Sequence, residues 1–408
     1  MKILRPFYRL SLLLSIFLFP LISTAQQFEG FEKLTIPIIP GDEIQKRQKQ
    51  LYENYERYYQ QQCEQARKNR SDRWHRDFSS LKAYEQSIQP QREHFLQLLG
   101  GWKWERGELK PRVEPLFEFD GIKVSRVWIR IFDDVEMDCL LLMPQGSKKR
   151  PAVLAQHGWN GTPEDVCGFV DNAVKPDYSY HQIGARLART GFIVIAPHMV
   201  GGWVPWPGDN RFIDSIPDKV FGYARTRVQR RASLVGMNLM GAEMFALSRA
   251  VDYLITLPEV DPENIGMYGL SQGGTSALYF PALDTRIKAS VSSAYFNQRD
   301  NKMLIRRSGI TPFIDSFEED RFTWPNLLDF SDSDIASLIC PRAFFAENGM
   351  KDSSVFWEDA REEFSLLKNY YEKLGIPERA EQHVHPYGHI ALGSRAIPFL
   401  KKHLGMKE

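Results

Sequence analysis

The chain has 408 residues, of which 43% are hydrophobic, and its formal net charge is +1 at pH 7. This length suits one large catalytic domain with an appendage, or two domains, and the apolar content is ample for a packed core. The near-zero net charge gives no reason to expect nucleic acid or a charged membrane surface as a partner.

The four cysteines lie far apart in the sequence and show no paired spacing, so a zinc site is not expected. They are Cys63, Cys139, Cys167 and Cys340. If two of them oxidise, Cys139 and Cys167 are the nearer pair in the predicted core. The sequence alone leaves that question open.

Residues 1–25 have the pattern of a secretory signal, with a basic start, an apolar run over residues 10–22 and small residues ending at Ala25. A membrane anchor is the alternative, but the apolar run is shorter than the roughly 20 residues that span a bilayer. We therefore expect a secreted or periplasmic chain that begins near Gln26. No stable membrane insertion is expected after cleavage.

Residues 26–112 are expected to form an N-terminal helical extension. The stretch after Gly41 is polar and lacks the alternation typical of strands, and tyrosines recur in it at helical spacing. A second helix is predicted over residues 83–99, with an interruption at Pro90. We expect the extension to pack across the catalytic domain. The alternative is a sugar-binding surface built from the tyrosines, which are Tyr52, Tyr55, Tyr58 and Tyr59.

Residues 113–408 are expected to form the catalytic domain, because the pattern changes there to short apolar strands. The first three strands are rich in alternating, β-branched and aromatic residues, which indicates an antiparallel run. Beyond Arg150 strands alternate with helices, which indicates a mostly parallel twisted sheet with helices on both faces and therefore the α/β class. The predicted strands are residues 116–119, 122–131, 137–143, 152–155, 192–196, 265–268, 287–291, 343–346 and 382–385.

Residues 197–235 fit no regular element and contain prolines, tryptophans and a basic run over residues 225–231. A loop this long inside a compact domain is usually functional or disordered. We expect it to form a lid over the mouth of the pocket, with Trp203 and Trp206 as a substrate wall. A plain structural insertion is the alternative.

The segment Gly269-Leu-Ser-Gln-Gly273 stands between a predicted strand and a predicted helix. Strand, sharp turn with a serine, then helix is the context of a nucleophile elbow. Glycines flank the serine because side chains there would collide, and the helix directs its N-terminal amides toward developing negative charge. We therefore expect Ser271 to be a nucleophile. The alternative is a glycine-rich turn with an inert serine.

A nucleophilic serine needs a base, and the base needs an acid that orients it. When a serine elbow comes first, the acid and the histidine follow in that order, each after a late strand. Asp352 follows the strand predicted over residues 343–346 through a short polar loop, and His389 follows the last predicted strand. The alternatives are that Asp352 is a solvated loop carboxylate, or that Glu347, at the strand end, is the acid.

The oxyanion hole is expected to use two backbone amides. One is the N–H of Gln272, the residue after the nucleophile. The other comes from the loop over residues 156–161, in which the N–H of Trp159 is the best placed. His157 is expected to brace that loop.

His383 and His385 stand two residues apart, hence on one strand face, and a metal pair is conceivable there. No acidic or histidine partner lies at ligand spacing, however. Neither a metal nor any other cofactor is therefore expected.

Gly269-Leu-Ser-Gln-Gly-Gly274 together with His157-Gly-Trp-Asn160 resembles the acetyl xylan esterase and cephalosporin C deacetylase family of carbohydrate esterases. It is similar also to dienelactone-hydrolase-like esterases encoded beside bacterial polysaccharide-uptake genes. The resemblance covers about residues 113–408 and implies an α/β-hydrolase fold. It also implies a catalytic triad and an oxyanion hole made of the five residues Ser271, Asp352, His389, Trp159 and Gln272.

The chain departs from the first of these families at two places. His198-Met-Val-Gly-Gly202 stands where that family carries Arg-Gly-Gln, and His389-Ile390 replaces its His-Glu ending. The elbow also lacks the cysteine and arginine of glucuronoyl esterases, which disfavours that activity. Substrate choice and oligomeric form are therefore not carried over.

These observations predict an exported serine esterase that acts on acetyl or similar small acyl esters of polysaccharides or oligosaccharides. One alternative is a peptidase resembling the prolyl oligopeptidases, although no propeller-like repeat precedes the domain. The other is an inactive carbohydrate-binding protein on a hydrolase scaffold. The sequence does not name the sugar, the acyl group or the number of subunits.

Overall fold

The structure is a computed structural model, and it describes residues 35–146, 148–175, 178–201, 223–305, 313–315, 319–322 and 326–406. The predicted signal over residues 1–25 lies outside the described residues. The chain divides into two compact units, Met1–Tyr58 and Tyr59–Glu408. No helix in the described ranges is long and apolar enough to cross a membrane.

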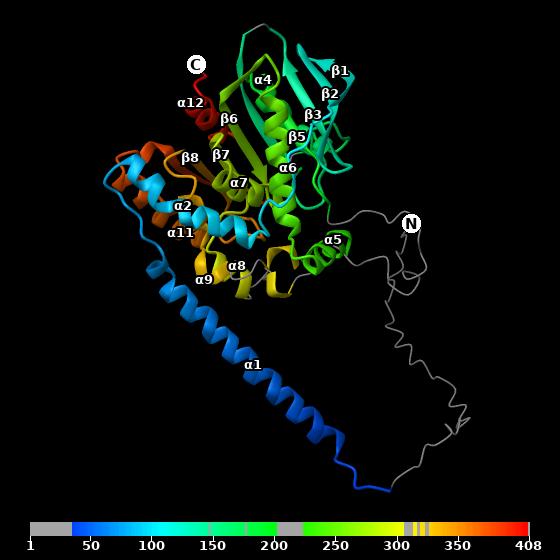
Figure 1. The fold of residues 1–408 in the computed structure, drawn as a ribbon, viewed down its shortest axis with the longest axis vertical. Coiled ribbons are helices and arrows are strands. Elements are labelled where there is room, and N and C mark those ends of the chain that lie inside the picture. The colour runs from blue at the N-terminus through cyan, green and yellow to red at the C-terminus, as the bar shows by residue number, and fades with distance from the viewer. Residues whose placement is uncertain are drawn as a thin grey trace, which may run out of the picture. The chain divides into compact units, whose positions relative to one another are not determined.

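Within the described residues, nine strands form one sheet in the order β1-β2-β3-β5-β4-β6-β7-β8-β9 (Figure 1). Strands β1 to β3 pair antiparallel, β3 pairs antiparallel with β5, and the neighbours from β5 to β9 are parallel. The predicted antiparallel start and mostly parallel sheet are therefore confirmed. The strands are β1 (Arg112–Phe119), β2 (Ile122–Phe132), β3 (Val135–Pro144), β4 (Arg150–Gln156), β5 (Ile193–Pro197), β6 (Val260–Leu270), β7 (Ile287–Ser293), β8 (Ala343–Gly349) and β9 (Ala380–His385).

Helices cover both faces of the sheet, and the core divides accordingly into two clusters. Val153 and Leu154 of β4 belong to different clusters, because successive strand side chains point to opposite faces. Strands β5 and β8 are buried along their whole length, as expected for parallel strands covered on both sides.

One cluster includes residues of α2, α6, α7, α10 and α11, and the other includes residues of α3, α4 and α12. The helices are α1 (Gly41–Asn69), α2 (Leu81–Leu98), α3 (Pro163–Cys167), α4 (Ile183–Arg189), α5 (Tyr223–Leu234), α6 (Leu239–Leu254), α7 (Gln272–Leu283), α8 (Arg299–Leu304), α9 (Asn326–Asp329), α10 (Asp332–Ser337), α11 (Trp357–Lys373) and α12 (Ala396–His403). Short 3-10 turns are η1 (Arg70–Arg73), η3 (Phe313–Asp315), η4 (Glu319–Arg321) and η5 (Pro377–Arg379).

Between residues 35 and 111 the structure has the helices α1 and α2, and α2 belongs to the main core. Tyr84, Ile88 and Phe95 of this helix are almost completely buried. The ring centroid of Phe95 lies 5.1 Å from those of Tyr279 and Phe330. Helix α1 contains no buried residue, and its four tyrosines are exposed.

Two local predictions are wrong. Helix α2 continues through Pro90, because residues on both sides of the proline are buried and their packing outweighs the lost backbone hydrogen bond. Residues 223–234, predicted to lack regular structure, form α5. Its Arg225 forms two hydrogen bonds with the carboxylate of Glu243, at 2.5 and 2.6 Å, so part of the basic run is held by a buried ion pair.

All four cysteines are free. Cys139 and Cys167 are both buried, but they belong to the two different core clusters. The sheet therefore separates the pair that the sequence left open for oxidation.

Replacing Phe95 with alanine should lower the free energy of unfolding by about 3–5 kcal/mol, because it removes a buried ring from the main core. Urea unfolding followed by circular dichroism measures this. Gln86→Ala, on the exposed side of the same helix, should change stability by less than about 0.5 kcal/mol. Equal effects of the two substitutions would contradict the placement of α2 in the core.

Candidate active site

Ser271 stands at the junction of β6 and α7, where its backbone has a φ of 60°. A positive φ is uncommon for a residue with a side chain, and here it turns the chain sharply from strand to helix. A Cβ atom on Gly269 would collide with the carbonyl oxygen of Gly273, and one on Gly273 would collide with that of Gln156. The geometry is that of an elbow, and only glycine fits at positions 269 and 273, two residues before and two residues after the serine.

The loop after β4 lies against this elbow. A Cβ atom built on Gly158 would lie 3.3 Å from the Cβ atom of Ser271. The N–H of Gly158 donates to the hydroxyl of Tyr180 at 2.8 Å. Gly158 is thus packed against Ser271 and anchored by Tyr180. The next residue is Trp159, the expected oxyanion donor. The sequence patterns gave no indication of this tyrosine.

His157 is buried at the start of the same loop. Its Nε2 accepts a hydrogen bond from the N–H of Met199 at 3.0 Å. Burial lowers the pKa of His157 to about 4, so the ring is neutral and able to accept. The contact braces the loop against the segment that follows β5.

His389 and Asp352 are in contact, with 2.8 Å between Nδ1 of the ring and Oδ2 of the carboxylate. Ser354 adds to this pair, because its Oγ lies 3.2 Å from Nδ1 and its N–H donates to Oδ1 of Asp352 at 2.7 Å. Burial alone would raise the pKa of Asp352, but the hydrogen bond and charge of His389, with Ser354, hold it below its usual value. An ionised Asp352 keeps the proton on Nδ1 and leaves Nε2 to act as a base.

Backbone hydrogen bonds join the loop that carries Asp352 to the end of β9. The N–H of Met350 donates to the carbonyl of His385 at 2.8 Å, and the N–H of Lys351 donates to that of Tyr387 at 2.9 Å. The acid and the histidine are therefore carried by two loops that are linked to each other directly.

Ser293, at the end of β7, connects these loops to the elbow. Its carbonyl accepts the N–H of Ser271 at 2.9 Å. Its hydroxyl lies 3.4 Å from the carbonyl oxygen of Ile390, the residue after His389. Ser271, Asp352 and His389 thus follow the carboxyl ends of β6, β8 and β9, the edge of a parallel sheet at which ligands bind.

Glu347, the alternative acid, is buried below this edge and bonds elsewhere. Its carboxylate accepts hydrogen bonds from the hydroxyls of Tyr268 and Ser293 and from the N–H groups of Leu392 and Gly393. Nδ1 of His389 is occupied by Asp352 and Ser354. The contacts therefore favour Asp352 as the acid.

Residues 137–323 match the family described as "DLH: Dienelactone hydrolase family". The match includes Trp159 and Ser271 and ends before Asp352. The Bacillus subtilis (strain 168) protein named "Putative hydrolase YtaP" is 28% identical over 211 residues, which are 50% of this chain and 60% of that protein. The chain thus matches less than two thirds of that relative's length.

Two solved structures share the architecture. A "putative acetyl xylan esterase (BF1801)" from Bacteroides fragilis NCTC 9343 has a TM-score of 0.58 at 17% identity, covering 77% of this chain and 78% of that one. A glucuronoyl esterase from Solibacter usitatus has a TM-score of 0.54 at 14% identity, covering 80% of this chain and 94% of that one. The predicted α/β-hydrolase fold is confirmed.

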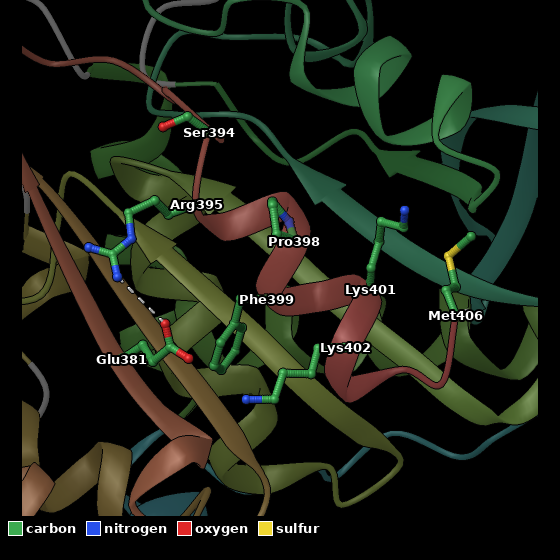
Figure 2. A pocket seen from close by; sticks show the side chains of 8 residues that line it. All are labelled: Glu381, Ser394, Arg395, Pro398, Phe399, Lys401, Lys402 and Met406. Atoms are coloured by element: carbon green, nitrogen blue, oxygen red, sulfur yellow. Dashed lines mark ion pairs between the residues drawn. The ribbon is translucent and has the colours of Figure 1, made fainter. Parts of the chain in front are cut away.

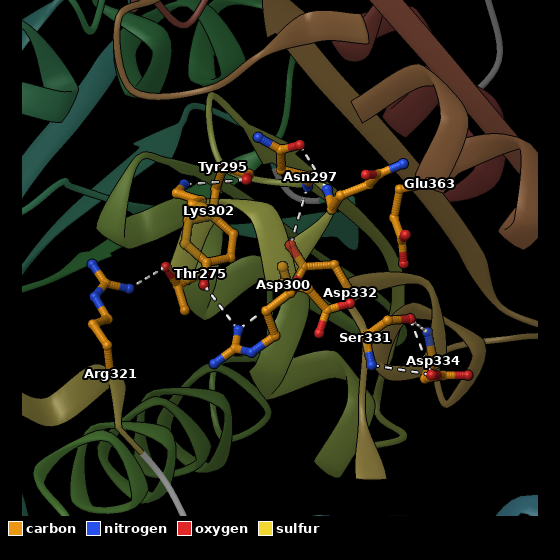
Figure 3. Close-up of polar contacts among 12 residues, drawn as sticks. Thr275, Tyr295, Asn297, Asp300, Lys302, Arg321, Ser331, Asp332, Asp334 and Glu363 are labelled. Carbon is orange, nitrogen blue, oxygen red and sulfur yellow. Dashed lines mark hydrogen bonds and ion pairs between the residues drawn. The ribbon is translucent and has the colours of Figure 1, made fainter. Parts of the chain in front are cut away.

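Two buried arginines lie near the ring of Trp159. The guanidinium carbon of Arg225 lies 5.3 Å from the ring centroid, and that of Arg321 lies 5.9 Å from it. Arg321 also donates to the hydroxyl of Thr275 at 2.7 Å, one turn after Ser271 in α7 (Figure 3). Both arginines lie beside the ring of Trp159, and sequence reasoning missed them because their contacts are long-range.

Trp203 and Trp206, the expected substrate wall, lie outside the described residues. The rings of His383 and His385 are 5.8 Å apart. In the part of the chain that the structure describes, no group of three or more histidine, cysteine or acidic side chains is arranged to hold a metal ion.

A cavity of about 830 Å³ lies on another part of the surface, along α12 (Figure 2). An ion pair between Arg395 and Glu381, at 4.0 Å, crosses one side of it. None of the described residues that line it belongs to the elbow or to the loops of Trp159 and Asp352. This cavity is therefore separate from the candidate active site.

The lowered pKa of Asp352 has a consequence for stability. Its pKa in the folded chain is below the unfolded value of about 3.9, so the ionised carboxylate stabilises the fold above that pH. The contribution is lost as the pH falls through the folded pKa. Asp352→Asn should therefore lower the free energy of unfolding more at pH 6 than at pH 3, as measured by urea titration.

The matched control for this comparison is Asp171→Asn, which changes an exposed carboxylate. It should have a small effect at both pH values. A loss from Asp352→Asn that is equal at the two pH values would contradict the ionised pairing with His389.

Proposed function

We propose that the chain is an exported serine esterase that removes acetyl or similar small acyl groups from polysaccharides or their oligosaccharides. The observation that carries the proposal is the positive φ of Ser271 at the elbow, combined with the paired His389 and Asp352 in loops that reach the same edge of the sheet. The structural neighbours described as esterases of carbohydrates support the choice of substrate class.

In this mechanism neutral His389 takes the proton of Ser271 as the serine oxygen attacks the ester carbonyl. The N–H groups of Trp159 and Gln272 stabilise the tetrahedral oxyanion, and the N-terminus of α7 adds to the favourable field. The protonated imidazole then supplies a proton to the leaving alcohol. Water attacks the acyl-enzyme by the reverse path and releases the acid. Asp352 holds the ring in the required tautomer.

The electrostatic environment suits this chemistry. Ser271 precedes a helix of 12 residues whose N-terminal amides face the elbow. The loop before Trp159 is held by neutral His157 and by Tyr180, so the proposed oxyanion donor is positioned before substrate binds.

Ser271→Ala should reduce turnover of para-nitrophenyl acetate by at least about 10⁴-fold, and Asp352→Asn by about 10³–10⁴-fold. The control is Ser365→Ala, which changes an exposed serine of α11 and should leave turnover unchanged. Hydrolysis retained by Ser271→Ala would refute the mechanism. Absence of turnover in the wild-type protein, with sugar binding retained, would favour an inactive binding protein.

The wild-type protein should release acetate from acetylated polysaccharides and little methanol from methyl-esterified ones. Both products can be followed enzymatically in parallel reactions, with Ser271→Ala as the blank. In this mechanism the acyl group is transferred to the serine and then released by water as the free acid. Acetate release therefore reports the proposed acyl specificity. Methanol without acetate would overturn the proposed substrate class.

A further inference from the structure

Glu347 is a fully buried carboxylate of β8 that contacts three other parts of the chain. Its Oε2 accepts hydrogen bonds from the hydroxyl of Tyr268 at 2.5 Å, the hydroxyl of Ser293 at 2.9 Å and the N–H of Leu392 at 3.1 Å. Its Oε1 accepts the N–H of Gly393 at 2.9 Å. Four donors thus surround this one carboxylate, three of them on Oε2 and one on Oε1.

The partners of Glu347 lie on the elements that carry the proposed catalytic groups. Tyr268 is on β6, three residues before Ser271, and Ser293 accepts the backbone N–H of Ser271. Leu392 and Gly393 follow His389 by three and four residues. The carboxylate therefore bridges the nucleophile strand and the histidine loop from below.

This bridge adds side-chain contacts to the spacing that the pairing of β6, β7, β8 and β9 already sets. Asp352 and His389 are joined to each other by a side-chain hydrogen bond, and their loops are joined by the backbone bonds of Met350 and Lys351. These contacts hold the acid and the base as one unit. Ser293 and Glu347 add side-chain contacts between that unit and the elbow.

The histidine loop has further anchors, because the N–H of Ala391 donates to the carbonyl of Ser179 at 2.7 Å and Arg186 donates to the carbonyl of Leu392 at 2.9 Å. These bonds tie the loop to α4 and to the segment before it. Tyr180, next to Ser179, accepts the N–H of Gly158 beside Ser271, so this side also supports the position of the loop relative to the elbow.

We propose that Glu347 is a positioning residue that sets the alignment of His389 with Ser271, an inference that rests on the proposed esterase function. The carboxylate acts through Ser293, Leu392 and Gly393 and does not contact the substrate. Burial raises its pKa, and the four donors oppose that effect. Small displacements of a base from its nucleophile are costly, because proton transfer requires hydrogen-bond distance.

Glu347→Gln tests this directly, because the amide keeps the size of the side chain but turns one acceptor into a donor. The new donor should displace the loop that carries His389. We expect kcat for para-nitrophenyl acetate to fall by about 10- to 100-fold, with KM changed by less than about threefold. Kinetics should be measured at 25 °C, with the folded fraction verified by circular dichroism. The rate of Ser271 labelling by a fluorophosphonate should fall in parallel.

Glu363→Gln is the matched control. Glu363 is also buried, and its Oε1 accepts the N–H of Ser333 at 2.7 Å, a bond that joins α11 to α10; Figure 3 shows its side chain near Ser331. Its substitution should lower stability while leaving kcat within about twofold of wild type. Equal losses of kcat in the two variants would show a general effect of a damaged core and would overturn the inference.

Two milder variants serve if Glu347→Gln does not fold. Tyr268→Phe and Ser293→Ala each remove one hydroxyl donor from Glu347, and each should lower kcat more than KM. The positioning role alone would be overturned if a folded Glu347→Gln variant kept kcat within twofold of wild type. The same conclusion would follow if both milder variants did so. Absence of ester turnover in the wild-type protein would instead overturn the proposed function.

Discussion

The steric constraint at the turn between β6 and α7 is the feature on which the rest of the site depends. Ser271 adopts a positive φ because the strand, the helix and the loop after β4 meet there with no room for Cβ atoms on Gly269 or Gly273. This close approach brings the loop of Trp159 against the serine and aims the amides of α7 at the same point. Backbone strain at this residue is offset by the buried sheet and helix on either side.

Strand β7 acts as the spacer of the candidate active site. It separates β6 from β8 in the sheet, and Ser293 at its end contacts both the elbow and the loop of His389. A spacer buried on both faces can hold loops from distant parts of the sequence at fixed positions. The chemistry proposed here therefore depends on packing below the site as well as on the groups within it.

Local patterns predicted much of this arrangement. Strand periodicity and the glycines around Ser271 reside in short segments, so the fold class could be read from the sequence. Helix α11 was not predicted, although Phe364, Leu367 and Tyr371 follow helical spacing. The Tyr180 anchor, the arginines at Trp159 and the bonds of Glu347 join residues far apart in the chain, and no spacing rule reveals such contacts. Helix α5 is also held by long-range ion pairs.

The most direct test of the account is a crystal structure of the wild-type protein after inactivation by an ester-mimicking phosphonate. We predict a covalent bond from phosphorus to Oγ of Ser271. The phosphoryl oxygen should lie within hydrogen-bond distance of the N–H groups of Trp159 and Gln272, and Nε2 of His389 should face the adduct. Modification of a different residue, or an imidazole of His389 out of reach of the adduct, would contradict the proposed catalytic centre.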